Sequence, residues 1–177
     1  MSKSERRARE RMPEGDERSI AQYLKERIYA TITGLAIVLV IGTNSEHHDA
    51  RGALFSLVIG VVGITAAGYL ADLIAHIAVH ANLPTPAEQR ILLRIALGGL
   101  STVVTPAILL VLAWSGVMEL DTSLNVSTIV YLVTLGLIGL GTVRRASIPW
   151  WTQLAVLAAL VGFGALVVGV QVLAHSV

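Results

Sequence analysis

Ionisable side chains recur every four residues in the apolar stretch "GYLADLIAHIAVH", where Asp72 is followed by His76 and His80. This spacing places the three side chains on one face of an α-helix. Carboxylates and imidazoles can take up and release protons, and inside a membrane such groups often mark a path for protons or ions. The spacing therefore raises two questions: which chemistry the residues perform, and which element carries them.

Two chemistries fit the spacing. Asp72 and His76 can act as relay groups for a proton or a cation. Alternatively, His76 and His80 are one helical turn apart and can share one metal ion. Asp72 cannot readily join that ion together with His80, because eight residues of helix span roughly 12 Å and ligand bonds are about 2 Å long.

The composition points to a membrane protein. Of the 177 residues, 54% are hydrophobic and 14% are charged, whereas soluble domains are about 25% charged. The chain has no cysteine, which excludes disulfides, thiolate metal sites and cysteine nucleophiles. A phosphate-binding loop, a zinc-protease motif and a nucleophile elbow are also missing from the sequence. We therefore expect neither an enzyme nor a cofactor.

Five apolar segments are long enough to cross a bilayer. A spanning helix needs about 20 residues to cross ~30 Å of hydrocarbon, and the segments lack the alternation of a β-barrel. The sequence thus predicts an all-α membrane protein, a bundle of five transmembrane helices. A domain over 20–177 would hold these spans, at about 20–43, 52–80, 86–116, 124–143 and 150–175.

Helix start signals refine this prediction. Ser19 and Gln22 have the spacing of a capping box, so we expect the first helix to start at Ser19. Thr85, Pro86 and Glu88 form a second start signal, with an N-cap, a proline at the first position and a capping box. Pro106 should kink the third span near Thr102.

The positive charges predict the orientation. Eight of the thirteen Lys and Arg residues lie in the first 27 residues, and Arg51 is the one that falls on the opposite side of a five-span arrangement. The positive-inside rule then places the amino terminus in the cytoplasm and the carboxyl terminus outside a bacterial cytoplasmic (inner) membrane. Residues 1–19 are predicted to form a basic, disordered arm that is attracted to anionic lipids. Its interleaved acids disfavour nucleic acid as a partner.

The orientation places Asp72 near the inner edge of the hydrocarbon. An aspartate there needs a proton or a cationic partner, and Arg94 enters from the same side on the next helix. An Asp72–Arg94 pair that fixes two helices is therefore the structural alternative to an ion path. The complete predicted track comprises Asp72, His76, Arg94, the flanking Tyr69, Thr105 on the Arg94 face, and Tyr131 at similar depth on the fourth span.

Small residues predict close helix packing. Rows at four-residue spacing let backbones approach in lipid. They predict contacts within the bundle, with a second copy, or with another membrane protein, besides the lipid bilayer itself. The four-residue spacing occurs in the second span at Gly63, Ala67, Ala71 and Ala75 and in the fifth span in the pairs Ala158–Gly162 and Ala165–Gly169, and the fourth span adds the small residues Gly136, Gly139 and Gly141.

Two stretches in the first half of the chain, "ERIYATI" and "YLADLIAH", resemble small bacterial multi-span integral membrane proteins of unknown activity. That family has a Tyr-Gly-Thr-Ile-like start of the first helix and an aromatic-Leu-Ala-His-like second helix. Ala30 stands where the family usually has Gly, and Asp72 where it usually has His. The resemblance implies a multi-span membrane protein and no catalytic residues. The exchange at Asp72 keeps an ionisable group, which favours a functional track.

Two functions are compatible with these observations. The first is a small transporter or channel that conducts protons or cations along the predicted track. The alternative is a non-transporting scaffold or accessory subunit of a larger membrane complex, held to its partners by the small-residue rows.

Overall fold

The computed structural model describes residues 14–43, 45, 48–145 and the single positions 151, 155 and 158. These residues are helical apart from the joints between helices, as predicted. In chain order the elements are α2 (Glu14–Thr43), α3 (Ala50–His80), α4 (Pro86–Leu100), the 3₁₀ turn η2 (Ser101–Val103), α5 (Val104–Trp114) and α6 (Leu120–Arg145).

The described residues form four long helical runs rather than the predicted five, with α4, η2 and α5 making one run. The predicted fifth span, 150–175, lies almost wholly outside the described residues, as do 1–13 of the predicted arm. Three runs are long and apolar enough to cross a membrane: Ala50–His80, Pro86–Trp114 and Leu120–Gly141. They match the predicted second, third and fourth spans, as expected for an integral membrane protein.

Two of the predicted helix starts can be compared with the structure. Thr85 and Glu88 form the predicted capping box, with the Thr85 backbone N–H donating to Glu88 Oε2 at 2.7 Å. The predicted start at Ser19 is wrong, because α2 already begins at Glu14. The sequence "EGDER" at 14–18 contains three acidic residues, a composition that favours the first turn of a helix.

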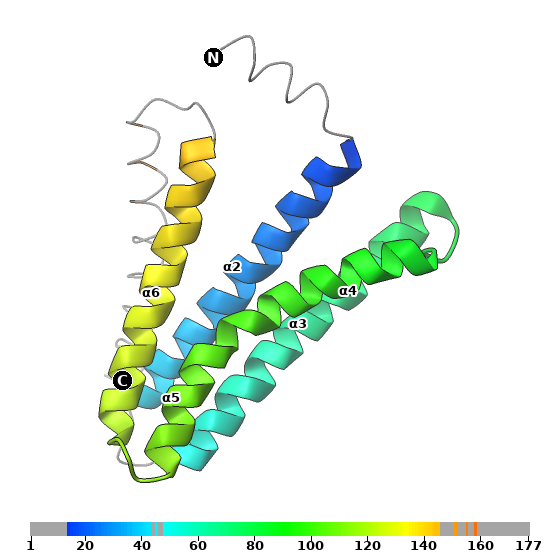
Figure 1. Ribbon diagram of the computed structural model, residues 1–177. Helices are drawn as coiled ribbons and strands as arrows, with labels where there is room; N and C mark the ends of the chain where they lie inside the picture. Colours follow the sequence, from blue (N-terminus) through cyan, green and yellow to red (C-terminus); the bar gives the residue numbers. More distant parts are fainter. Residues whose placement is uncertain are drawn as a thin grey trace, which may run out of the picture.

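Pro106 interrupts the third run as predicted. The 3₁₀ turn η2 precedes it by one turn, and the chain changes direction between α4 and α5 (Figure 1). A proline has no N–H to donate to the preceding turn. At the kink, the Thr102 hydroxyl donates to the Gly99 carbonyl at 2.8 Å and the Ser101 hydroxyl to the Gly98 carbonyl at 2.7 Å. Hydroxyls thus hydrogen-bond the distorted backbone.

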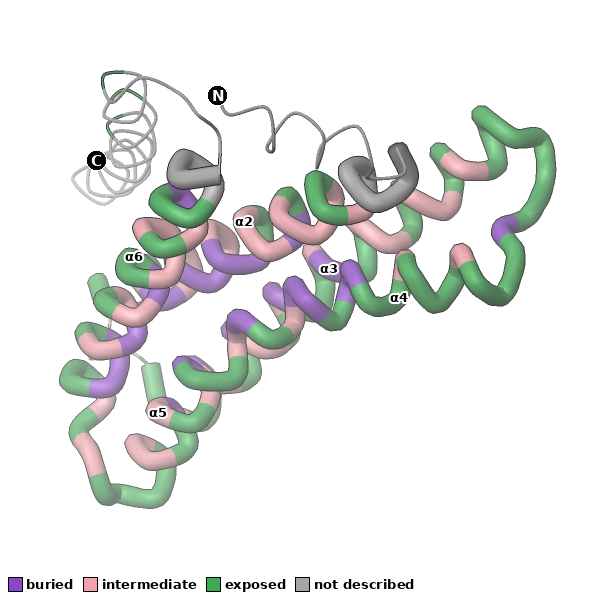
Figure 2. Tube along the Cα trace, turned by 45° about the horizontal axis from the view of Figure 1, so that its top comes forward, coloured by how far each residue is buried: buried purple, intermediate pink, exposed green. Residues whose placement is uncertain are grey.

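Helix α2 is the centre of the bundle and packs against α3, α4 and α6 (Figure 1). Its buried face follows a helical period through Glu26, Ala30, Gly34, Val38 and Ile41. Figure 2 shows buried positions directed between the helices and exposed positions along their outer sides. Many outward residues are large and apolar, such as Ile59 and Ile74 on α3. Such an outer surface suits contact with lipid.

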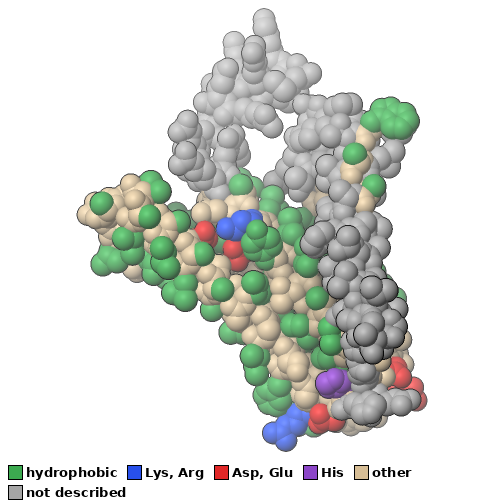
Figure 3. Space-filling view, turned by 180° about the vertical axis from the view of Figure 1, so that it is seen from behind, with side chains coloured by type: hydrophobic (Ala, Val, Ile, Leu, Met, Phe, Trp, Pro, Cys, Tyr) green, Lys and Arg blue, Asp and Glu red, His purple; other side chains and the backbone are tan. Residues whose placement is uncertain are grey.

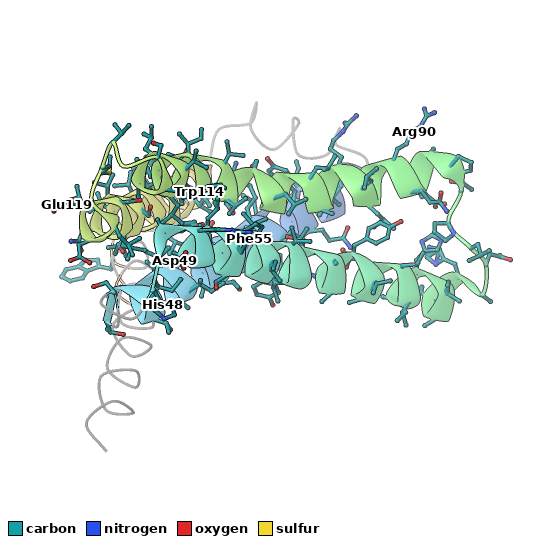
Figure 4. All side chains as sticks on the ribbon, turned by 90° about the horizontal axis from the view of Figure 1, so that it is seen from below. His48, Asp49, Phe55, Arg90, Trp114 and Glu119 are labelled. Carbon is teal, nitrogen blue, oxygen red and sulfur yellow. The ribbon has the colours of Figure 1, made fainter. Side chains whose placement is uncertain are left out.

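The two ends of the bundle are marked by different residues. His48, Asp49, Trp114 and Glu119 lie at one end, and Arg90 lies at the opposite end (Figure 4). Trp114 is 55% exposed, which suits an interfacial tryptophan. The end with Asp49 and Glu119 corresponds to the predicted outer side, and the end with Arg90 to the predicted inner side.

Candidate functional site

Three glycines bring α2, α3 and α4 into close contact. A Cβ atom at Gly99 of α4 would lie 3.3 Å from Thr65 Oγ1 of α3 and 3.5 Å from the Glu26 carbonyl oxygen of α2. At Gly68 of α3 it would overlap the Glu26 side chain, and at Gly98 of α4 the ring of Tyr23. Because these positions have no side chain, polar groups of α2 can enter the junction of the three helices.

Glu26 is the buried acid of this junction. Its exposed fraction is 3%, although it belongs to a helix that contributes mainly apolar residues to the core. Among the described residues, no hydrogen-bond partner is found for its Oε1 atom, and none for the buried Thr65 hydroxyl one turn before Gly68. A buried carboxylate without its full set of hydrogen bonds costs several kcal/mol, so it is rarely kept without a role.

Lys25 joins Glu26 to Asp72. Its Nζ atom lies 3.6 Å from Glu26 Oε1 and 3.6 Å from Asp72 Oδ1. The Asp72 side chain is 11% exposed and that of Glu26 only 4%, whereas the Lys25 side chain is 43% exposed. We call Lys25, Glu26 and Asp72 the charged cluster. Figure 3 shows acidic and basic side chains grouped within an otherwise largely apolar face.

The predicted Asp72–Arg94 pair is wrong. In the described part of the chain, Asp72 pairs with Lys25 of α2, and no ion pair joins it to Arg94. Although α3 and α4 are packed together, Arg94 is exposed because the inward face of α4 carries Ile95, Gly98 and Gly99. The partner of Asp72 therefore comes from α2 and not, as predicted, from α4.

His76 and His80 lie near the turn that joins α3 and α4. Their ring centroids are 4.5 Å apart, and His76 Nε2 lies 4.0 Å from Glu88 Oε2. Glu88 is held by the Thr85 backbone and hydroxyl, both at 2.7 Å. A search of the described residues finds no group of three or more His, Cys, Asp or Glu side chains that could hold a metal ion. The metal-site hypothesis therefore gains no support from the geometry.

The remaining predicted track residues do not converge on one line. Tyr69 is half-buried, and Thr105 is exposed, like Arg94, on the outer side of the third run. Tyr131 is 1% exposed, and its hydroxyl lies against Gly34 of α2. The structure thus brings Asp72 to Lys25 and Glu26, places His76 nearer the α3–α4 turn, and separates Arg94 and Thr105 from both.

Searches of family models, curated proteins and solved structures return no match to this chain.

Lys25 and Glu26 were not among the predicted site residues, because they lie near the start of the first predicted span, outside the stretch in which ionisable residues recur every four positions. Helical periodicity could have identified Glu26 as a buried residue. Glu26 is four residues before Ala30 and eight before Gly34, so it shares their face. On that face, an acid next to small residues indicates burial against another helix rather than solvation.

The charged cluster can bind one more positive charge. Two carboxylates share one ammonium group, so the three side chains carry a net charge of −1 when all are ionised. A proton or a monovalent cation would neutralise the cluster. Inside an apolar bundle, neutralisation lowers the free-energy penalty of burying charge. The arrangement is therefore suited to alternate between a protonated or cation-bound state and a free state.

Proposed function

We propose that this protein is a small transporter or channel of the bacterial cytoplasmic membrane that moves protons or monovalent cations. The observation that carries the proposal is the burial of Glu26 beside Lys25 and Asp72 at the junction of α2, α3 and α4. Ionisable groups within membrane helices are expensive and are commonly functional. In this proposal, Asp72 and Glu26 receive the proton or cation, and Lys25 balances their charge in the free state.

The proposal includes five membrane spans. Helix α2 and the segment 150–175 join the three spans described above, so the amino terminus lies in the cytoplasm and the carboxyl terminus outside. This arrangement keeps nearly all Lys and Arg residues on the inner side. The charged cluster then lies toward the inner side of the membrane, and His76 and His80 lie beyond it.

Reconstitution in liposomes tests the proposal. Wild-type protein should carry a flux of protons, Na⁺ or K⁺ that is measured with an entrapped ion-sensitive dye under an imposed gradient. Glu26→Gln and Asp72→Asn should each lower that flux about tenfold or more, because they remove the charge that binds the ion. Asp49→Asn is the matched control, since Asp49 is exposed at the other end of the bundle and asparagine caps a helix as well as aspartate does.

The flux assay can also reject the proposal. If protein that is folded by size-exclusion chromatography carries no flux of any of these ions, the protein is not a transporter of this class. An equal loss of flux in Asp49→Asn and Glu26→Gln would show that the charged cluster has no specific part in transport.

A second function, a scaffold or accessory subunit, is favoured by one specific observation. Gly63, Ala67, Ala71 and Ala75 of α3 are all exposed, and a Cβ atom at Gly63 would meet nothing within 4 Å. Such a row admits a closely packed helix from another protein or another copy. Under this alternative, Ala71→Leu should change the mass of the detergent-solubilised assembly measured by light scattering, while wild-type protein shows no ion flux.

A further inference from the structure

A row of buried hydroxyls runs along α6, apart from the charged cluster. Ser123, Ser127 and Tyr131 follow one another at four-residue intervals and are 0%, 0% and 1% exposed. In the described part of the chain, none of the three hydroxyl oxygens has a hydrogen-bond partner. We call these residues the hydroxyl row. Three successive buried hydroxyls without partners are unusual, because buried polar atoms are nearly always hydrogen-bonded.

Other hydroxyls of the same helix behave differently. The Thr128 hydroxyl donates to the Leu124 carbonyl at 2.9 Å, and that of Thr134 to the Val130 carbonyl at 2.7 Å. This bond to the preceding turn is the usual solution for a hydroxyl in a helix. Ser123 and Ser127 do not adopt it, so their oxygens stay available for another partner inside the bundle.

The spacing of the row fits single water molecules. Four residues of helix rise about 6 Å, and two O–H···O hydrogen bonds of about 2.8 Å through one water span nearly the same distance. By this spacing the two serine hydroxyls are too far apart to bond directly and suitably placed to share a water. The row contains neutral oxygens, whereas a divalent cation such as Ca²⁺ needs six to eight oxygen ligands. The row is therefore better suited to hold water and pass protons than to bind a divalent cation.

The row connects one end of the bundle to α2. Ser123 lies four residues after the exposed Glu119, which is at the same end of the bundle as His48 and Asp49 (Figure 4). At the other end of the row, the Tyr131 hydroxyl reaches Gly34, one turn from the buried Thr31. The Thr31 hydroxyl donates to the Arg27 carbonyl at 2.6 Å, the same bond to the preceding turn that Thr128 and Thr134 make, so Thr31 lies on the way to Glu26 but does not belong to the hydroxyl row. Gly34 and Glu26 are eight residues apart, roughly 12 Å along the helix.

We infer that the hydroxyl row is a hydrated half-channel that carries protons from the end bearing Glu119 to the charged cluster. The row and the Gly34-to-Glu26 stretch each cover roughly 12 Å, which together approach the ~30 Å of hydrocarbon in a bilayer. This inference rests on the proposed transport function, since a path needs a cluster that receives its protons. The hydration of the row is nevertheless a property that can be measured without any flux.

Cysteine reactivity tests the hydration. The chain has no cysteine, so Ser127→Cys and Ser123→Cys each provide a single thiol of nearly the same size as the serine side chain. The probe is methyl methanethiosulfonate, a small reagent that reacts with thiolates, and a thiolate forms only where water is present. The fraction that has not reacted is counted after denaturation by the gel shift with polyethylene-glycol maleimide. Leu124→Cys is the matched control, because Leu124 is 2% exposed on the same helix.

The expected result is that Ser127→Cys and Ser123→Cys react about tenfold or more faster than Leu124→Cys. Equal slow reaction of all three variants would show a dry row and overturn the half-channel, even if the wild-type protein carries a flux. Equal fast reaction would show general opening of the helix rather than a path and would overturn it too. Fast reaction of the serine positions in a protein without flux would leave the hydrated row standing and reject the transport function.

Discussion

The carboxylate of Glu26 lies directly on Gly68, so that a Cβ atom at position 68 would overlap the acid. This contact explains how an acidic residue of α2 reaches the interior. Gly68 removes the one side chain of α3 that would occupy the same space, and Asp72, four residues later, meets Lys25 from the same face. The positions of the two carboxylates therefore both depend on α3 carrying glycine at this point.

Gly68→Ala should displace Glu26 and destabilise the bundle. We expect a loss of about 1–3 kcal/mol in the free energy of unfolding, because overpacking forces neighbouring groups to move. The measurement is unfolding of detergent-solubilised protein by heat or SDS. Gly63→Ala is the control on the same helix, since a Cβ there meets nothing within 4 Å and alanine favours helix. Equal stability of the two variants would show that Glu26 does not depend on Gly68.

Lys25→Met should leave two carboxylates without their shared cation. We expect the free energy of unfolding to fall by about 1–2 kcal/mol at neutral pH. The expected loss is small because the Lys25 side chain is 43% exposed and is partly screened by solvent. Adding Glu26→Gln to Lys25→Met should recover much of the loss, because one buried charge is then removed. The double-mutant cycle is measured by the same unfolding assay.

Arg94→Gln serves as the control for Lys25→Met. Arg94 is exposed and, in the described structure, not paired with Asp72, so its replacement should change stability by less than about 0.5 kcal/mol. A larger loss for Arg94→Gln than for Lys25→Met would reinstate the pairing that the sequence predicted and contradict the charged cluster.

The sequence was sufficient to predict the elements. Length and apolarity predicted the spans that correspond to α3, to α4–α5 and to α6, and local rules predicted the Thr85 capping box and the kink before Pro106. These features depend on residues close in the chain. The start of α2 was predicted five residues too late, because the acidic residues before Ser19 were taken as part of the solvated arm.

The site was predicted only in part, because it depends on which helices touch. Asp72 was identified from its rarity in an apolar segment, but its partner was assigned to the next helix in the chain. The structure packs α2 against α3 and α4 through glycines, and this arrangement brings in Lys25 instead of Arg94. Helical periodicity fixes the face that a residue occupies, but it does not fix which neighbour that face meets.

Tyr131→Phe separates a structural role from a role in proton transfer. The Tyr131 hydroxyl is buried, and within the described residues it has no hydrogen-bond partner. Removing it should therefore leave stability unchanged or raise it by up to about 1 kcal/mol. If the hydroxyl row conducts protons, the same substitution should lower proton flux in liposomes severalfold. A residue that only packs would not produce a loss of flux without a loss of stability.

The matched control for Tyr131→Phe is Thr134→Val on the same helix. The Thr134 hydroxyl already donates to the Val130 carbonyl at 2.7 Å, so its removal should leave proton flux nearly unchanged. A loss of flux in Thr134→Val as large as that in Tyr131→Phe would indicate a general effect of altering α6 and would contradict a specific role for the Tyr131 hydroxyl.

The proposed orientation of the bundle can be tested at His48 and Arg90, which lie at its two ends (Figure 4). Since the chain has no cysteine, His48→Cys and Gln89→Cys each provide one exposed thiol at a known end. In intact cells, a membrane-impermeant maleimide should label position 48, while position 89 should react only after the membrane is opened. The reason is that Arg90, Arg94 and the basic amino-terminal arm stay on the cytoplasmic side. Labelling of position 89 in intact cells, with position 48 protected, would reverse the orientation and would place the charged cluster toward the outer face instead.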